Sequence, residues 1–236
     1  TRGCRFCAVD TIRNPPPPDE DEPIKLAEAI KNMGLTYSVI TVVNRDDMED
    51  GGALHYKNCI DKVHEICPHV GIEFLCSDLS GNIKALDFLL KDSPLTVFAH
   101  NVETVRSLTP RVRDPRATFD QSLLILKKAK EFRPDIITKT SIMLGLGETE
   151  ENLLDAFKDL RKANVDLLTL GQYLSPGPRY HPVVSFPSPE TFDSLAQIAK
   201  EMGFKAIASG PMVRSSYRAE SLVAAAKGET FDIELK

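Results

Sequence analysis

The chain has 236 residues, of which 42% are hydrophobic and 27% charged, an ordinary composition for a globular protein of one large domain or two small ones. A net charge of −5 argues against a broad face for gripping nucleic acid, and no apolar run reaches the roughly 18 residues that a membrane-spanning helix needs. The five cysteines are too scattered for a disulfide framework, which favours a reducing compartment.

The predicted elements alternate between apolar strands and amphipathic helices. Residues 13–23 carry five prolines and four acids, which predicts a stiff loop. Runs of β-branched and apolar residues then predict buried strands at 37–43, 72–76, 95–99, 136–144 and 165–170. Helices are predicted at 149–163, capped by Thr149, and at 188–203, capped by Ser188. This alternation is typical of βα units and favours a barrel or partial barrel.

Polar clusters follow four of the five predicted strands. They are the stretches "NRDDMEDGG", "HNVET", "GLGE" and "GQYLSPGPRYHP". In barrels of βα units, function collects where the strands end and the loops begin. We therefore expect one site that is lined from several directions.

Cys4 and Cys7 form a Cys-x-x-Cys pair, which by itself leaves several chemistries open. A thioredoxin-like motif wants a helix directly after the pair, but the prolines at 15–18 intervene. A zinc site wants a second cysteine pair, and Cys59, Cys67 and Cys76 have the wrong spacing. We expect these three cysteines to be buried and structural.

The context "TRGCRFC" resembles the end of the Cys-x-x-x-Cys-x-x-Cys loop of radical S-adenosylmethionine (SAM) enzymes, including the aromatic Phe6. In that family three thiolates hold a [4Fe–4S] cluster whose fourth iron binds SAM, and thiolates suit iron–sulfur clusters. The resemblance implies that Cys4 and Cys7 are two of the three ligands. The first ligand would then lie one residue before Thr1, and the chain alone would be inactive.

Further stretches resemble the lipoyl synthases, from Thr1 to about Ala224. They are "RDDMEDGGA", "AHNVETV", "VRDPRATFDQSL", "TKTSIMLGLGET", "LTLGQYL" and "SGPMVRSSYRA". The resemblance implies an α/β fold, a partial (β/α)6 barrel of the radical SAM class with its first strand before Thr1. It also implies a core over 1–210 and an extension over 211–236 that closes the barrel mouth.

The activity that this resemblance implies is sulfur insertion. Radicals generated from SAM remove hydrogens from the sixth and eighth carbons of an octanoyl group that is attached to a lipoyl carrier domain. The carriers would be the E2 subunit of a 2-oxoacid dehydrogenase or the glycine cleavage H protein, and ferredoxin or flavodoxin would supply electrons. A second, auxiliary [4Fe–4S] cluster donates the sulfur. Cofactors carry the chemistry, so the carboxylates are expected to be anchors, and no catalytic side chain is predicted.

The resemblance also assigns ligands. One serine of "RSSY" would bind the auxiliary cluster, and Ser216 is favoured over Ser215; by itself the stretch would predict a helix cap. Residues expected to contact SAM or substrate follow the predicted strands or lie within them: Asp46, Asp47, Asn101, Glu103, Lys139, Ser141, Gln172 and Tyr173. By themselves the stretches with Asp46, Asp47, Asn101 and Glu103 are compatible with charged loops and polar turns. Lys139 is included because a lysine is rarely buried without a partner.

Two alternatives stay open. A biotin-synthase-like sulfur-inserting enzyme would share the cysteine loop but has no reason to carry "RSSY", and a non-catalytic metal-binding scaffold would share both. Asn44, the loop 77–82 and Gly177 depart from the lipoyl synthase pattern, which leaves the substrate contacts open. The stretches "RNPPPP" and "DDMEDGGA" favour a mitochondrial location over the cytoplasm or a plastid.

Overall fold

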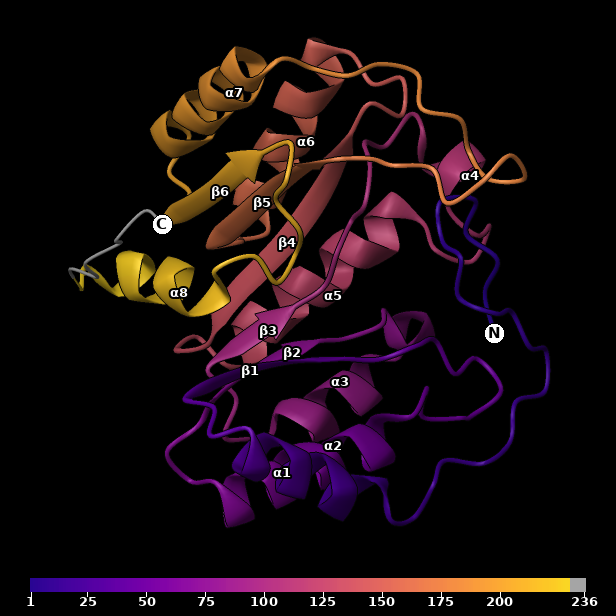
Figure 1. The fold of residues 1–236 in the computed structure, drawn as a ribbon, viewed down its shortest axis with the longest axis vertical. Coiled ribbons are helices and arrows are strands. Elements are labelled where there is room, and N and C mark those ends of the chain that lie inside the picture. The colour runs from indigo at the N-terminus through magenta and orange to yellow at the C-terminus, as the bar shows by residue number, and fades with distance from the viewer. Residues whose placement is uncertain (230–236) are drawn as a thin grey trace.

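Six parallel strands form one open, curved sheet in the computed structural model, which describes residues 1–229 (Figure 1). The strands pair in chain order, β1 with β2 through to β5 with β6, and every pairing is parallel. They are β1 (Tyr37–Thr41), β2 (Gly71–Leu75), β3 (Val97–Ala99), β4 (Ile137–Leu144), β5 (Leu167–Gln172) and β6 (Ala206–Gly210). The sheet is therefore a partial barrel, as predicted.

Helices connect the strands and cover the outer face of the sheet (Figure 1). They are α1 (Glu22–Asn32), α2 (Ala53–Ile66), α3 (Ile83–Leu90), α4 (Thr109–Val112), α5 (Phe119–Phe132), α6 (Glu150–Lys162), α7 (Pro189–Glu201) and α8 (Ala219–Lys227), with a short 3-10 helix, η1 (Leu79–Gly81). The central strands β3, β4 and β5 are buried almost throughout, as is typical of a parallel sheet, whereas the edge strands β1 and β6 each have one buried residue of five. None of the described helices is long and apolar enough to cross a membrane.

All five predicted strands are present, but the sequence did not predict β6. This strand reads "AIASG", and its small residues provide neither an apolar run nor an alternating pattern. It pairs with β5 and forms one edge of the sheet. Because Pro23 stands in the first turn of α1, the proline-rich loop ends slightly earlier than predicted.

Two predicted helix starts are confirmed by their capping contacts. The Thr149 hydroxyl accepts a hydrogen bond from the Asn152 N–H at 3.2 Å, and the Asn152 side-chain oxygen accepts one from the Thr149 N–H. Ser188 caps α7 through the N–H of Thr191. These caps fix where each helix leaves the strand-end loops.

The C-terminal extension divides between the two ends of the barrel. Residues 213–215 line a cavity at the carboxyl ends of the strands. Helix α8, by contrast, packs its Leu222 and Val223 against residues that begin β3, β4 and β5. The Thr36 hydroxyl, just before β1, donates a hydrogen bond to Glu220 at 3.2 Å. The part of the extension that reaches the mouth is thus its loop, while α8 covers the opposite end.

Candidate functional site

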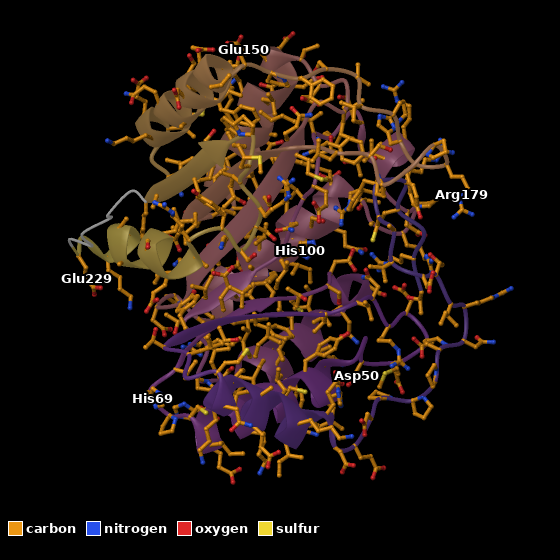
Figure 2. All side chains as sticks on the ribbon, viewed as in Figure 1. Asp50, His69, His100, Glu150, Arg179 and Glu229 are labelled. Atoms are coloured by element: carbon orange, nitrogen blue, oxygen red, sulfur yellow. The ribbon has the colours of Figure 1, made fainter. Side chains whose placement is uncertain are left out.

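Two adjoining cavities open at the carboxyl ends of the strands. The larger, of about 330 Å³, is lined by the N-terminal segment and by the ends of β1, β2 and β3. The other, of about 280 Å³, is lined by β4, the end of β5 and the loop 213–215. Phe6, Asn101 and Glu103 line both cavities, which we together call the cleft. His100, labelled near the middle of Figure 2, lies at its base.

Cys4 and Cys7 lie in one tight turn on the wall of the larger cavity. The Cys7 N–H donates to the Cys4 carbonyl at 3.1 Å, and both side chains are half-buried. The Asp114 N–H lies 3.3 Å from the Cys4 sulfur. Burial raises the pKa of the Cys4 thiol, while the Asp114 N–H and the charge of Arg113 oppose this rise. The two sulfurs are therefore accessible to a soft metal centre from inside the cleft.

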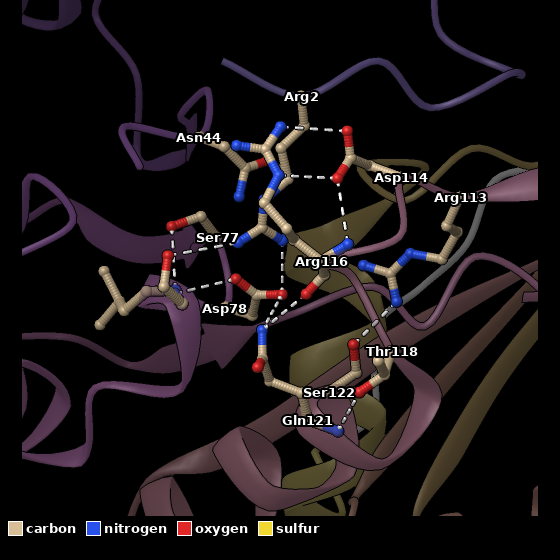
Figure 3. A network of polar contacts seen from close by, with 12 residues as sticks. Arg2, Asn44, Ser77, Asp78, Arg113, Asp114, Arg116, Thr118, Gln121 and Ser122 are labelled. Carbon is tan, nitrogen blue, oxygen red and sulfur yellow. Dashed lines mark hydrogen bonds and ion pairs between the residues drawn. The ribbon is translucent and has the colours of Figure 1, made fainter. Parts of the chain in front are cut away.

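Arg2 fixes the cysteine-bearing segment to the ends of β1 and β2 (Figure 3). Its guanidinium donates to Asp46 at 2.7 Å and to Asp78 at 2.6 Å, and the Arg2 side chain is only 3% exposed. Asp46 also accepts bonds from the hydroxyls of Thr1 and Ser80, both at 2.6 Å. Burial would raise the pKa of Asp46, but these partners hold it well below its usual range.

Asp114 fastens the same segment from the other side (Figure 3). Its carboxylate accepts the Gly3 N–H at 3.0 Å and the Arg116 Nε–H at 2.9 Å. Arg116 in turn donates to the Thr1 carbonyl at 2.9 Å. The segment that carries Cys4 is therefore held by carboxylates from three separate loops, so the geometry around the thiols is preorganised.

We expect Asp78→Asn to lower the free energy of unfolding by about 3 kcal/mol at pH 7, because it leaves the buried Arg2 guanidinium partly unpaired. Burial would raise the pKa of Asp78, but Arg2 and the positive surroundings lower it in the folded state. The wild type's advantage should therefore be complete above the unfolded pKa of about 4 and shrink as the pH falls below it. Urea unfolding of both proteins at several pH values measures this.

The matched control is Asp19→Asn, which breaks an exposed pair with Lys25 and should leave stability unchanged. Equal stabilities of Asp78→Asn and the wild type at pH 7 would show that Asp78 does not hold the segment.

The contact with SAM that the sequence predicts for Asp46 and Asp47 stays a prediction, and the structure shows each carboxylate paired with an arginine of the chain. Neither lines the cleft; Asn44 and Arg45 do. Asp46 is occupied by Arg2, and Asp47 accepts two bonds from Arg45, at 2.9 and 2.8 Å. Both carboxylates are thus neutralised by arginines of the chain, in line with the expectation that carboxylates act as anchors.

The polar group of the cleft consists of Asn101, Glu103 and Ser141. Asn101 and Glu103 line both cavities, and Ser141 lines the smaller one. Glu103 has a left-handed backbone, with φ of 67°, and bridges to Ile142 of β4. Burial raises the pKa of its carboxyl, which the charge of Arg113 and a hydrogen bond from Asn101 oppose. A non-glycine residue held in this conformation is strained, and such residues cluster at functional sites. The structure therefore supports this group as the polar centre of the cleft.

Gln172 and Tyr173 line the smaller cavity, where the Gln172 amide nitrogen and the Tyr173 hydroxyl already have hydrogen-bond partners. The Gln172 amide donates to the carbonyls of Leu144, Tyr173 and Ser185. The Tyr173 hydroxyl donates to the His181 carbonyl at 2.7 Å. Both side chains therefore hold the loop after β5 in place, and the predicted contact of Gln172 and Tyr173 with the cofactor stays a prediction.

Lys139 points into the barrel as predicted, yet it does not line the cleft. Side chains of a strand alternate, so Lys139, Ser141 and Met143 form successive inward layers of β4, and only the last two line the smaller cavity. The Lys139 ammonium donates a hydrogen bond to the Glu73 carboxylate at 2.7 Å, and both side chains are buried. The lysine's partner is thus Glu73, which also accepts the Tyr37 hydroxyl, and the cofactor contact that the sequence predicts for Lys139 stays a prediction.

Lys139→Met should cost about 3–5 kcal/mol of unfolding free energy, because it leaves Glu73 as a buried, unpaired carboxylate. The double variant Lys139→Met/Glu73→Leu should recover most of that loss, since it removes both charges. Urea unfolding of the two variants measures the effect. A loss of SAM affinity with normal stability would instead support the cofactor contact of Lys139.

The two serines of "RSSY" differ in exposure. Ser215 is half-buried and lines the smaller cavity, whereas Ser216 is exposed and does not. The sequence favoured Ser216, but the turn over 215–218 directs the preceding serine toward the cleft. Ser215 is therefore the better-placed candidate ligand.

The other cysteines are buried, as expected, and none of them is paired in a disulfide. The Cys67 thiol donates to the Ala27 carbonyl at 3.8 Å. Cys59 lies near His55 and Glu22, and the three ligand atoms are within 4.8 Å of one another. This group belongs to a side cavity between α1, α2 and β1, where the 2.6 Å bond between His55 and Glu22 ties α1 to α2.

The sequence did not single out three residues that hold the cysteine-bearing segment, Arg2, Asp78 and Asp114, nor Arg113, which lines the larger cavity. A signal was present, because Arg113 and Asp114 open "VRDPRATFDQSL", one of the stretches that resemble lipoyl synthases. Arg2 stands two residues before Cys4, so its partners could not be deduced without the fold.

The barrel and the cysteine turn at its mouth together define a class. Residues 1–160 match the family model described as the radical SAM superfamily, and the chain belongs to this superfamily. Within it the chain is similar to lipoyl synthases. It is 53% identical over 219 residues to the mitochondrial lipoyl synthase of Coprinopsis cinerea and 54% identical over 222 residues to the chloroplastic lipoyl synthase of Arabidopsis thaliana.

These matches cover 93% and 94% of this chain but 56% of each relative's own length. Among solved structures, methylornithine synthase superimposes with a TM-score of 0.58 at 15% identity, covering 79% of this chain and 53% of that one. That likeness concerns the fold alone and supports the partial barrel.

Superfamily membership implies a [4Fe–4S] cluster and SAM. The residues of the cleft fit such a group. Cys4 and Cys7 offer two sulfurs, and the buried Nε of Arg113, which also lines this cavity, has no hydrogen-bond partner among the described residues. A soft donor pair beside an unsatisfied cation suits a negatively charged thiolate-bound cluster.

Proposed function

We propose that this chain is the barrel of a lipoyl synthase, which inserts two sulfur atoms at the sixth and eighth carbons of a protein-bound octanoyl group. The observation that carries the proposal is that the fixed Cys4–Cys7 turn lines the same cavity as Asn101 and Glu103. The identity to lipoyl synthases over more than nine-tenths of the chain supports it.

In this proposal Cys4 and Cys7 hold the SAM-binding cluster in the larger cavity, and Ser215 contributes to the auxiliary, sulfur-donating cluster from the smaller one. When bound, the SAM-binding cluster and SAM together supply the radical chemistry that removes hydrogen from unactivated carbon. The protein's part is to bind, orient and shield. Asn101, Glu103 and Ser141 provide polar contacts for SAM at the meeting of the cavities.

Exclusion of water falls to the apolar side chains of the cleft. Phe6, Val42 and Leu75 line the larger cavity, and Met143 and Leu174 line the smaller one. A closed, water-poor site keeps reactive intermediates from side reactions, and the substrate C–H bond must be held nearer to the radical than any C–H bond of the wall. The octanoyl chain is itself apolar and would be buried against this surface.

The partners would be octanoylated lipoyl carrier domains, of the 2-oxoacid dehydrogenase E2 or glycine cleavage H protein type, and a small electron donor such as ferredoxin or flavodoxin. The relatives include mitochondrial and chloroplastic enzymes. For this chain we propose the mitochondrion.

The test uses the complete gene product, meaning this chain with the residues that its gene encodes on either side. After anaerobic reconstitution with iron and sulfide, it is mixed with SAM, a reductant and an octanoylated carrier peptide. Mass spectrometry should find the lipoyl peptide. Sulfur inserted only into a small free substrate would favour a biotin-synthase-like enzyme, and an absence of SAM cleavage would favour a non-catalytic scaffold.

A further inference from the structure

Arg113 is a buried cation at the base of the cleft. It directly follows α4, is 8% exposed, and lines the larger cavity together with Cys4 and Cys7. Figure 3 shows its guanidinium directed toward Ser122 and apart from the Arg2 network. The proposed function gives it no role.

The hydrogen bonds of Arg113 lead only to neutral groups. Its Nη1 donates to the Ser122 hydroxyl at 2.8 Å and to the Val102 carbonyl at 3.4 Å. Ser122 in turn bonds His100 Nε2 at 2.9 Å, and His100 Nδ1 bonds the Cys76 carbonyl. Burial, with the charge of Arg113, lowers the pKa of His100 to about 4, so the imidazole is neutral at physiological pH.

No carboxylate in the described part of the chain forms an ion pair with Arg113, and its Nε is buried without any partner. The neighbouring carboxylates are engaged elsewhere, Asp114 by Arg116 and Asp78 by Arg2. Glu103 lines the same cavity, and the charge of Arg113 opposes the rise that burial causes in the pKa of its carboxyl, but the two side chains form no ion pair or hydrogen bond among the described residues. A buried charge without a counter-charge is costly, so a structure that retains one has an anion to set against it.

We propose that Arg113 is the counter-charge of the iron–sulfur cluster held by Cys4 and Cys7, and that it favours the cluster's reduced form. The proposal rests on the proposed function, because it requires that cluster. One-electron reduction adds a negative charge to the cluster, and a fixed cation in a buried, water-poor site stabilises the more negative state. Arg113 does not contact the substrate in this proposal. It supplies a fixed positive charge and affects the reaction through the reduction potential of the cluster.

The test measures the midpoint potential of the reconstituted complete gene product by redox titration followed by electron paramagnetic resonance. The cluster in question is identified as the one whose reduced spectrum changes when SAM is added. Arg113→Gln and Arg113→Met should each lower the ratio of reduced to oxidised cluster at a fixed potential by on the order of tenfold, which corresponds to about 59 mV for one electron. Two neutral variants are used so that at least one packs well.

Two controls separate charge from structure. Arg113→Lys keeps the charge and should keep the wild-type potential, and Ser122→Ala removes the hydrogen-bond partner but no charge and should do the same. The proposal is overturned if the neutral variants hold the cluster at the wild-type potential, or if Ser122→Ala shifts it as far as they do. A wild type that holds no SAM-responsive cluster would overturn the proposed function together with this one.

Discussion

Replacing Cys7 by alanine in the complete gene product is expected to abolish SAM cleavage, leaving 5′-deoxyadenosine at the level of a protein-free control. The Cys4–Cys7 turn supplies two of the three proposed thiolate ligands of the cluster. With only two thiolates left, the protein cannot hold a cluster in which three irons are bound by cysteine and the fourth is open to SAM. Liquid chromatography of the products after reduction, together with the iron content of the protein, measures this.

The matched control is Cys59→Ala, which removes a buried cysteine outside the cleft and should leave SAM cleavage intact. Continued formation of 5′-deoxyadenosine by the Cys7 variant would contradict the ligand assignment. A loss in the Cys59 variant that equals the loss in the Cys7 variant would point to damaged folding instead.

Ser215→Ala should separate the two halves of the reaction. It is expected to spare SAM cleavage, because Cys4 and Cys7 line the other cavity, and to reduce the lipoyl product to background, because Ser215 lines the cavity proposed for the sulfur-donating cluster. The two products are quantified in one assay by chromatography and mass spectrometry.

Ser216→Ala is the control, since its exposed side chain lies one residue further along and does not line the cavity. Normal lipoyl product from Ser215→Ala, with loss in Ser216→Ala, would restore the ligand that the sequence favoured. Normal product from both variants would remove "RSSY" from the sulfur-donating site.

The sequence predicted the parts of the fold that depend on local patterns. Continuous apolar runs predicted five of six strands, and capping residues such as Thr149 predicted where helices begin. Strand β6 was not predicted, because the side chains of "AIASG" are small and give no strand pattern. In the structure its pairing partner is β5. Its position at the sheet edge is a tertiary property.

The location of the candidate site could be predicted from the sequence, but the hydrogen bonds and ion pairs of its residues could not. That polar residues after the strands would gather in one place followed from parallel topology, and Asn101 and Glu103 lie there. The partners of Asp46 and Lys139 did not follow, because Arg2 and Glu73 are 44 and 66 residues away. The alternation of side chains along β4 predicts that Lys139 points inward. How far it lies from the carboxyl end of the strand depends on where β4 begins and ends, which the sequence pattern does not define.

The central claim is that this cleft directs radical hydrogen abstraction to the octanoyl chain of a carrier protein. An octanoylated carrier peptide deuterated at the sixth and eighth carbons tests it most directly, when incubated with SAM, reductant and the reconstituted complete gene product. We expect deuterium in the 5′-deoxyadenosine that forms, and two sulfur atoms in the peptide. Unlabelled 5′-deoxyadenosine beside an unchanged octanoyl peptide would contradict it.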